Sequence, residues 1–305
     1  MIRFVLKRLL WGIPVLLGVA TLTFILMQVV PGGPFDKEKP LPPEIKANVE
    51  AKYHLDKPIW QQYLLYLKAL LRGDLGPSYK YLGRDVADII RDTLPVSLQL
   101  GLLALLVAIA SGLVLGIVAV VRPYSWIDRT GMILATAGIS IPNFVIGALL
   151  ILFLAHMYKV FPPALWEGWR HTILPALTLG LGPAAFIARL MRASLLETLH
   201  QDFVRTARSK GLGEGTILLK HVLKNSVMPV VTFLGPLAAT LVTGSFIVEY
   251  IFSIPGMGKF FITAVTNRDY PLIMGVTLVY SALILAANLL VDIAYAYLDP
   301  RVRID

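Results

Sequence analysis

The 305-residue chain contains no cysteine, which excludes disulfide bonds, thiolate metal sites and cysteine nucleophiles. Charged residues are also scarce: Asp, Glu, Lys and Arg make up 15% of the chain, against 56% hydrophobic residues. This is too little charge to cover an ordinary soluble domain, so the composition predicts a protein whose solvent is lipid. The net charge of +9 sits between long apolar runs and not along a groove, which excludes a nucleic-acid-binding class.

Catalytic motifs are absent as well. The nearest match to a phosphate-binding loop, "PGMGKF", lacks the hydroxyl that would hold magnesium. The chain has no His-Glu-x-x-His and no Gly-x-Ser-x-Gly sequence, and its five histidines lie apart along the chain. We therefore expect no catalytic residue, no metal and no cofactor in this chain, which then is not an enzyme and cannot hydrolyse a nucleotide by itself.

The long apolar runs predict an all-α polytopic membrane protein, because a bilayer core about 30 Å thick needs roughly 20 apolar residues in a helix. Six transmembrane helices are predicted at residues 9–30, 94–121, 138–158, 173–192, 229–251 and 272–297. The third run contains Pro142, so we expect a kink near the start of that helix and an interfacial segment at 122–137. The stretch "PIWQQYLLYLKALLRG" is too short and too polar to span, which favours an interfacial or protein-packed helix; if it did span, the C-terminus would change sides.

The distribution of Lys and Arg orients the predicted helices. Basic residues are concentrated in residues 1–8, 122–137, 193–228 and 298–305, whereas the short segments 159–172 and 252–271 carry only Lys159, Arg170, Lys259 and Arg268. The positive-inside rule then predicts cytoplasmic N and C termini, with 159–172 and 252–271 as external loops. Residues 31–93 form an external cap region with short helices, one of them in "PPEIKANVEAKYHL".

One cytoplasmic stretch, "FVRTARSKGLGEGTILLKHVLKN", is cationic and broken by glycines. At helical spacing its first part has an apolar face, formed by Phe203, Val204 and Ala207, and its second part restarts the pattern with Ile217, Leu218, His221 and Val222. Gly211 and Gly213 lie between the two parts, where a positive φ ends the first helix. The pattern predicts two short amphipathic helices meeting at a corner, which a docking helix needs and a solvated basic loop does not.

The chain resembles the inner-membrane permeases of binding-protein-dependent ABC importers. The residues that carry the resemblance run nearly end to end: "LKRLLWGIPVLLGVATLTF", "PGGPF", "DLGPSY", "SIPNF", "FVRTARSKGL", "GSFIVEYIFSIPGMGKFF", "NRDYPLI" and "YLDPRVR". Each motif alone is weak, but their order across the predicted helices is specific. The pattern is most similar to the oligopeptide/dipeptide/nickel branch, and there to the first permease subunit of oligopeptide systems.

The resemblance implies a type I ABC importer permease in the bacterial inner membrane. It implies a homologous second permease, two ATPase subunits that bind ATP and magnesium, an external solute-binding protein and a peptide substrate. It further implies that the basic stretch contacts the ATPase through Phe203, Val204, Arg205, Thr206, Ala207, Arg208, Lys210, Gly211, Leu212 and Glu214. The family's motif in this stretch matches at Ala207, Gly211 and Leu223 and departs at Arg205, Thr206, His221 and Lys224.

Two further sites are expected. A translocation path would use Pro142, Asn143, Asn288 and Asp292, although a helix-to-helix hydrogen bond also explains Asp292. In the external region, Trp60, Tyr63 and Tyr66 either dock the solute-binding protein or cover the bundle as a lid. The alternatives for function are a secondary transporter or channel acting alone, a structural membrane subunit, and an importer of nickel chelates or sugars.

Overall fold

The computed structural model describes residues 2–30, 35, 51 and 53–298, and this part of the chain contains helices and turns but no strand. The all-α prediction is therefore confirmed. Four of the described helices are long and apolar enough to cross a membrane, at Arg3–Val29, Val86–Val121, Trp169–Leu199 and Tyr270–Ile293. Two bent helix pairs raise the number to six if each pair is one span. The predicted helix in "PPEIKANVEAKYHL" falls mostly outside the described residues.

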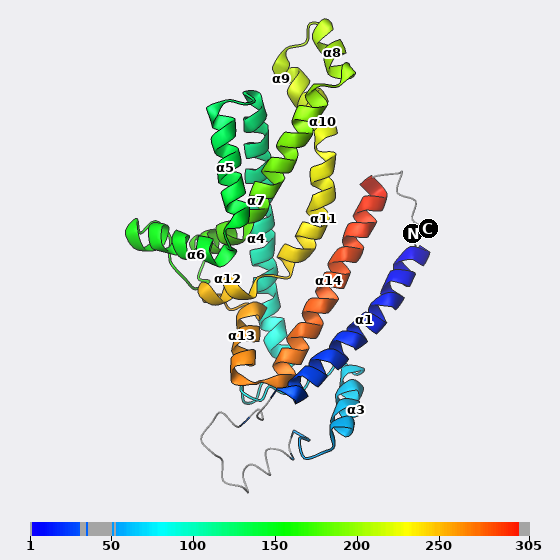
Figure 1. Ribbon diagram of the computed structural model, residues 1–305. Coiled ribbons are helices and arrows are strands. Elements are labelled where there is room, and N and C mark those ends of the chain that lie inside the picture. The colour runs from blue at the N-terminus through cyan, green and yellow to red at the C-terminus, as the bar shows by residue number, and fades with distance from the viewer. Residues whose placement is uncertain (1, 31–34, 36–50, 52, 299–305) are drawn as a thin grey trace. The chain divides into compact units, whose positions relative to one another are not determined.

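The chain divides into two compact units (Figure 1). Unit 1 comprises Met1–Val96 and Gly256–Leu285. It contains α1 (Ile2–Val29), α3 (Ile59–Leu70), the start of α4 (Val86–Val121), α13 (Met257–Asn267) and the first part of α14 (Tyr270–Leu298). Its core is formed where the start of α4 meets α13 and α14, by residues that include Val86, Ile89, Met257, Leu272 and Val276.

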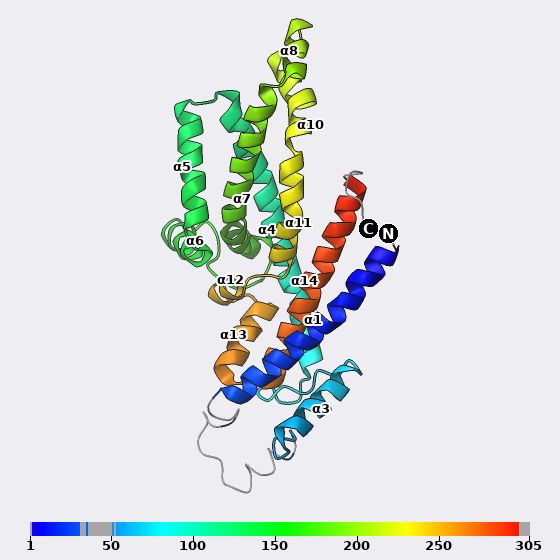
Figure 2. The same cartoon turned by 45° about the vertical axis from the view of Figure 1, so that its right-hand side comes forward.

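Unit 2 comprises Ser97–Pro255 and Ala286–Asp305. Besides the rest of α4 and α14 it contains α5 (Trp126–Ser140), α6 (Asn143–Leu150), the π-helix η1 (Ile151–Met157), α7 (Trp169–Leu199), α8 (Asp202–Ser209), α9 (Glu214–Thr216), the π-helix η2 (Ile217–Val222), α10 (Leu223–Ser226), α11 (Met228–Val242) and α12 (Phe246–Ile251). Helix α7 is the centre of this unit, because it packs against α5, α6 and α11. Both ribbon views show α5, α7 and α11 side by side, with α8 at one end of the unit and α6 and α12 at the other (Figures 1 and 2).

Small residues allow α4 and α7 to approach each other closely within unit 2. A Cβ atom added at Gly112 of α4 would lie 2.7 Å from the carbonyl oxygen of Ala184, and one added at Gly180 of α7 would lie 2.7 Å from that of Ala104. Real Cβ atoms do not approach backbone oxygens this closely, so these glycines permit the contact between the two helices. Close backbone packing at small residues is a common source of association between membrane helices.

Replacing Gly112 with alanine is expected to lower the free energy of unfolding by about 1–3 kcal/mol, the usual cost of overpacking. The matched control is Gly131→Ala in α5, where an added Cβ would meet nothing within 4 Å. That change should instead stabilise the protein by about 0.5–1 kcal/mol, because alanine is the better helix former. Thermal unfolding of the two purified variants in detergent measures the difference, and equal midpoints would contradict the packing argument.

The third predicted membrane helix, residues 138–158, is wrong as one continuous helix. Helix α5 continues through Ser140, and α6 with η1 begins at Asn143, so the two arms are bent by 110° at the break. Pro142 does not kink a helix interior as predicted, since it occupies the N-cap of α6 with φ −57° and ψ 140°. Ile141 is extended, with ψ 125°, as expected before a proline. Residues 126–137 of the predicted interfacial segment belong to α5.

The fifth predicted helix, residues 229–251, is also interrupted. Helix α11 ends at Val242, and α12 begins at Phe246 after Gly244, which has φ +80°. Ser245 caps the new helix because its Oγ accepts a hydrogen bond from the Val248 amide at 3.4 Å. The segment 252–271, predicted as a loop, contains the helix α13.

The remaining helices begin or end outside their predicted bounds. Helix α4 starts at Val86 and not at residue 94, and α7 runs from Trp169 to Leu199 and not over 173–192. At 1.5 Å per residue, the 36 residues of α4 extend about 54 Å, well beyond a hydrocarbon core of about 30 Å. Hydropathy locates the apolar part of such a helix and not its ends.

Candidate functional site

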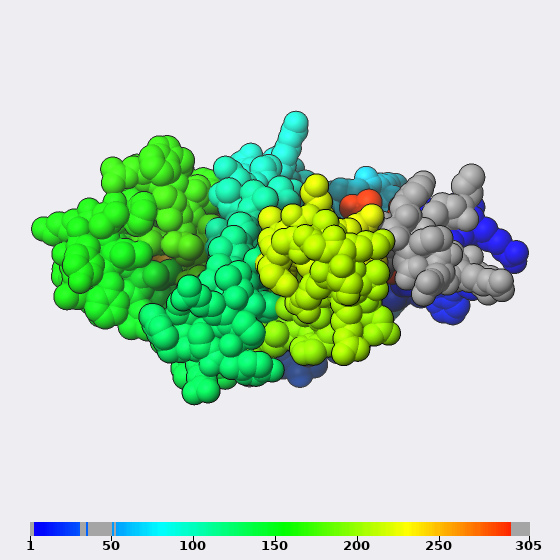
Figure 3. Space-filling model, turned by 90° about the horizontal axis from the view of Figure 1, so that it is seen from above, coloured from blue at the N-terminus to red at the C-terminus, as the bar shows by residue number. Residues whose placement is uncertain are grey.

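The predicted amphipathic helix in the basic stretch is present as α8. Val204 and Ala207 are buried and Phe203 is half-buried, whereas the side chains of Arg205, Arg208 and Ser209 are exposed. The buried face packs against η2. Seen along the helices of unit 2, α8 and α9 (yellow-green) are not covered by other segments on this face (Figure 3). The cationic side of α8 is therefore open to a partner.

Helix α8 ends in a Schellman motif centred on Gly211. The Gly211 amide donates to the carbonyl of Arg208 at 2.9 Å, and the Leu212 amide donates to the carbonyl of Ala207 at 3.3 Å. This pair of hydrogen bonds requires a left-handed residue at the position of Gly211, whose φ is +77°. The predicted glycine corner is thus confirmed at Gly211. The prediction of a positive φ at Gly213 is wrong, because Gly213 has φ −69° and is the N-cap residue of α9.

An ion pair crosses this corner. The guanidinium of Arg208 donates from Nε to Glu214 Oε1 at 2.7 Å and from Nη2 to Oε2 at 3.2 Å. Both side chains are largely exposed, so water screens the pair and it contributes little to stability. Its two parallel hydrogen bonds nevertheless fix the direction of α9 relative to α8. We call residues 202–222, which include α8, the corner, α9 and η2, the corner segment.

Beyond the corner the predicted apolar face is only partly correct. Ile217 and Val222 are fully buried and Leu218 is half-buried, but His221 is exposed. Residues 217–222 form a π-helix, whose wider turn brings Val222 nearer to the side of Ile217 than an α-helix would. The prediction that His221 shares this buried face is wrong.

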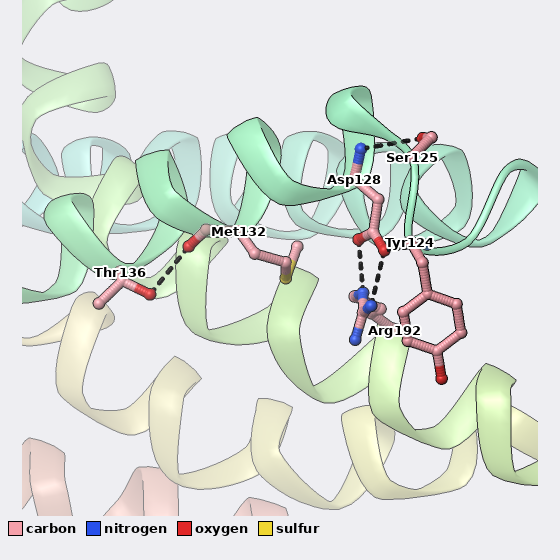
Figure 4. A network of polar contacts seen from close by, with 6 residues as sticks. All are labelled: Tyr124, Ser125, Asp128, Met132, Thr136 and Arg192. Atoms are coloured by element: carbon pink, nitrogen blue, oxygen red, sulfur yellow. Dashed lines mark hydrogen bonds and ion pairs between the residues drawn. The ribbon is translucent and has the colours of Figure 1, made fainter.

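A buried ion pair that the sequence did not reveal joins α5 to α7 (Figure 4). Arg192 donates from Nε to Asp128 Oδ1 and from Nη2 to Asp128 Oδ2, both at 2.6 Å. Asp128 is 1% exposed, and its Oδ2 also accepts a hydrogen bond from the Tyr124 amide at 2.8 Å. The guanidinium lies 5.9 Å from the ring centroid of Tyr124. The sequence carried only a local signal, Ser125 three residues before Asp128, which is a helix-capping pattern. In the structure the Asp128 amide donates to Ser125 Oγ at 3.4 Å.

The predicted docking residues of the external region do not form one surface. In unit 1, the Tyr63 hydroxyl lies 2.6 Å from Thr21 Oγ1 of α1, and Tyr66 stacks on Phe24 with centroids 6.1 Å apart. Burial raises the pKa of Tyr66 to about 12. Only Trp60 is open, with 62% of its surface exposed. The two tyrosines therefore hold α3 against α1, and the pattern of exposure does not support a joint docking role.

Two motifs of the sequence, "DLGPSY" and "NRDYPLI", contact each other through Asp269 in unit 1. This carboxylate is fully buried and accepts hydrogen bonds from the Ser78 hydroxyl, from the Tyr79 amide at 3.1 Å and from the Leu272 amide at 3.4 Å. The last bond caps the N-terminus of α14. Burial and the Asp269 carboxylate together raise the pKa of Tyr79. Asp269 thus ties residues 78–79 to the start of α14.

The four predicted path residues lie on two separate elements. Pro142 and Asn143 are at the break between α5 and α6, both exposed, and a Cβ added at Gly182 of α7 would lie 3.4 Å from Asn143 Oδ1. Asn288 and Asp292 are one helical turn apart on α14; Asn288 is exposed and Asp292 is half-buried. Their role in a path stays a prediction.

The fold is that of the membrane subunit of an ABC transporter. A chain of the inward-facing MetNI methionine ABC transporter is similar over 69% of this chain and 94% of its own length, with a TM-score of 0.55 and 19% identity. A chain of an amino acid ABC transporter crystallised with histidines is similar over 69% and 94%, with a TM-score of 0.54 and 17% identity. At these identities the likeness concerns the fold alone.

The chain belongs to the family described as binding-protein-dependent transport system inner membrane component. The family profile matches residues 112–304, and the profile of its N-terminal part matches residues 1–101. The protein is accordingly a multi-pass protein of the inner membrane. The resemblance noted from the sequence motifs is confirmed by these full-length matches.

Curated relatives are similar over the whole chain. The dipeptide transport system permease protein DppB of Bacillus subtilis (strain 168) is 46% identical over 304 residues, which is 100% of this chain and 99% of that protein. The oligopeptide transport system permease protein OppB of Escherichia coli (strain K12) is 42% identical over 305 residues, covering 99% and 100%. Both are transport permeases, which confirms the prediction of a transport subunit and not an enzyme.

Proposed function

We propose that this chain is one of two permease subunits of an ATP-driven importer of peptides. The full-length similarity to dipeptide and oligopeptide permeases supports the substrate class. The observation that carries the coupling role is the rigid corner at Gly211, which holds an exposed cationic helix in a fixed direction. ATP and magnesium bind to separate ATPase subunits, and an external solute-binding protein delivers the peptide. The corner segment and both chain termini face the cytoplasm.

Coupling the ATPase to the membrane helices requires a stiff connection between them. Moving a two-state protein from 1:99 to 99:1 requires a difference of about 5.5 kcal/mol between the two states. A flexible loop would absorb the motion of the ATPase, whereas a helix fixed at both ends transmits it as a rigid-body movement. Helix α8 meets this requirement, because its apolar face packs on η2 and the Arg208–Glu214 pair spans its corner. Of the residues expected to contact the ATPase, Val204 and Ala207 are buried and serve the packing of α8 instead. The exposed ones that remain for the contact are Arg205, Thr206, Arg208, Lys210, Gly211, Leu212 and Glu214.

The movement reaches the membrane helices by two routes within unit 2. Helix α7 leads directly into α8, and η2 continues through α10 into α11. Helices α7 and α11 also pack against each other, so a rotation of the corner segment acts on both. The translocation path is proposed to lie between this chain and a homologous second permease, with Pro142, Asn143, Asn288 and Asp292 as candidates for its lining.

Reconstitution tests the proposal. We expect liposomes that contain this chain, its second permease and two ATPases to take up a labelled dipeptide or oligopeptide only with ATP and the solute-binding protein. Liposomes with this chain alone should take up none, with or without an ion gradient. Gradient-driven uptake by the isolated chain would establish a secondary transporter and overturn the proposal. Uptake of a nickel chelate or sugar in preference to peptides would overturn the substrate class alone.

A further inference from the structure

The face of α3 that meets α1 carries polar contacts beside the aromatic ones already described. Gln62 donates from Nε2 to the carbonyl oxygen of Lys57 at 2.8 Å, and its Oε1 accepts a hydrogen bond from Gln28 of α1 at 3.3 Å. Tyr63 adds the contact with Thr21, also on α1. The contacts with Gln28 and Thr21 hold α3 against α1 within unit 1.

The outer face of α3 is apolar. Trp60, Leu64 and Leu71 are 62%, 54% and 90% exposed, and their spacing of four and seven residues places them on one side of the helix. Lys68 and Arg72 are exposed beside this stripe. An exposed apolar stripe with cationic side chains at its edge is typical of helices that lie in a membrane interface, where tryptophan is also enriched.

The contacts with α1 give the depth of α3. They involve Thr21, Phe24 and Gln28, and α1 ends at Val29, so all three lie within about 12 Å of its end at 1.5 Å per residue. Helix α1 is itself a membrane-length apolar helix, and Leu22, Leu26 and Val29 are exposed along the same part of it. Because α1 has no charged residue after Arg8 and its apolar run reaches Val29, the hydrocarbon core ends near Val29. The stripe on α3 is therefore level with this boundary.

We propose that the outer face of α3 binds the phospholipid surface of the leaflet at the C-terminal end of α1. Trp60, Leu64 and Leu71 enter the boundary of the acyl chains, and Lys68 and Arg72 contact lipid phosphates. The composition of this face favours lipid over a protein partner, because it combines a large apolar stripe with two cations and lies beside exposed apolar side chains of α1. Neither the orientation of the chain in the membrane nor its substrate enters this inference.

Spin labels test the proposal directly, because the natural chain has no cysteine. Leu64→Cys places a label on the stripe, and Leu82→Cys is the matched control, since Leu82 is 84% exposed in the same unit but outside α3. The complete transporter carrying either label is placed in nanodiscs of phosphatidylethanolamine and phosphatidylglycerol. Collision rates with oxygen, which concentrates in lipid, and with a water-soluble nickel chelate are then compared. We expect oxygen to dominate at residue 64 and the nickel chelate to dominate at residue 82.

Three results would overturn the proposal. The first is a label at residue 64 that is open to the nickel chelate in nanodiscs. The second is a label at residue 64 that loses its collisions with the nickel chelate when the solute-binding protein is added, which would make the stripe a docking surface for that protein. The third is a label shielded from both reagents, which would place protein over the stripe. The contacts of Lys68 and Arg72 with lipid phosphates are tested by the double change Lys68→Glu and Arg72→Glu. It should raise the collision rate of the residue 64 label with the nickel chelate, and an unchanged rate would exclude the phosphate contacts.

Discussion

Replacing Gly211 with valine is expected to abolish ATP-driven uptake while leaving the protein folded and inserted in the membrane. A Cβ at this position would meet nothing within 4 Å, so the substitution is not limited by space. The obstacle is the φ of +77°, which costs an ordinary residue about 1–2 kcal/mol and a β-branched residue more. Valine should therefore break the Schellman hydrogen bonds, and α9 should lose its fixed direction relative to α8.

Two control variants separate conformation from contact. Gly211→Asn keeps the corner, because asparagine tolerates the left-handed region, and most of the uptake should remain. Gly213→Val introduces the same side chain two residues away, where φ is −69° and an added Cβ also meets nothing within 4 Å. Uptake and ATPase activity stimulated by the solute-binding protein are measured in the reconstituted complex. Normal stimulated activity with Gly211→Val would refute the role of the corner in coupling.

The sequence was informative where an apolar run is uninterrupted or a local pattern is strong. It located the four long helices, the short helix in residues 58–73, and the amphipathic helix before Gly211. All of these follow from periodicity or hydropathy over neighbouring residues. The ends of the long helices were missed because their terminal turns leave the apolar core and hydropathy no longer marks them.

The breaks in the third and fifth runs were harder to predict. Both runs are apolar enough on average that hydropathy gives one helix where the backbone makes two. Gly244 has φ +80° and stands between Thr243 and Ser245, a local turn signal that the hydropathy of the run outweighed. Pro142 was recognised, but a proline in a membrane run is compatible with a kinked helix and with a new helix start. The bend of 110° depends on how α5 and α6 each pack against α7, which is tertiary information.

Long-range polar contacts could not be predicted from one sequence. Asp128 and Arg192 are 64 residues apart, and each has a sufficient local explanation as a helix-capping acid or a cytoplasmic cation. Asp269 and Ser78 are 191 residues apart. Nothing local distinguishes a carboxylate that will be buried from one that stays in water. Ser78 and Asp269 lie within the motifs "DLGPSY" and "NRDYPLI", whereas Asp128 and Arg192 lie in none of the identified motifs.

Removing Arg192 is expected to destabilise the protein more than removing any exposed cation. In Arg192→Leu the buried carboxylate of Asp128 keeps its bond from the Tyr124 amide but loses its charge partner, and breaking a buried pair costs about 3–5 kcal/mol. Asp128→Leu should cost less, because the side chain of Arg192 is 22% exposed and can turn to water. The double variant should recover part of the loss of Arg192→Leu, since no buried charge remains.

The Arg208–Glu214 pair provides the control, because it has the same bidentate geometry and side chains 45% and 69% exposed. Arg208→Leu should change the free energy of unfolding far less than Arg192→Leu, because water screens the exposed pair. Thermal unfolding of the four variants in detergent gives the comparison, and uptake by the reconstituted complex shows whether the joint between α5 and α7 also serves transport. If Arg192→Leu unfolds at the same temperature as Arg208→Leu, the buried pair does not hold these helices together. If instead the predicted order is found, α5 is fixed to the helix that leads into α8, and a movement of the corner segment must carry α5 with it.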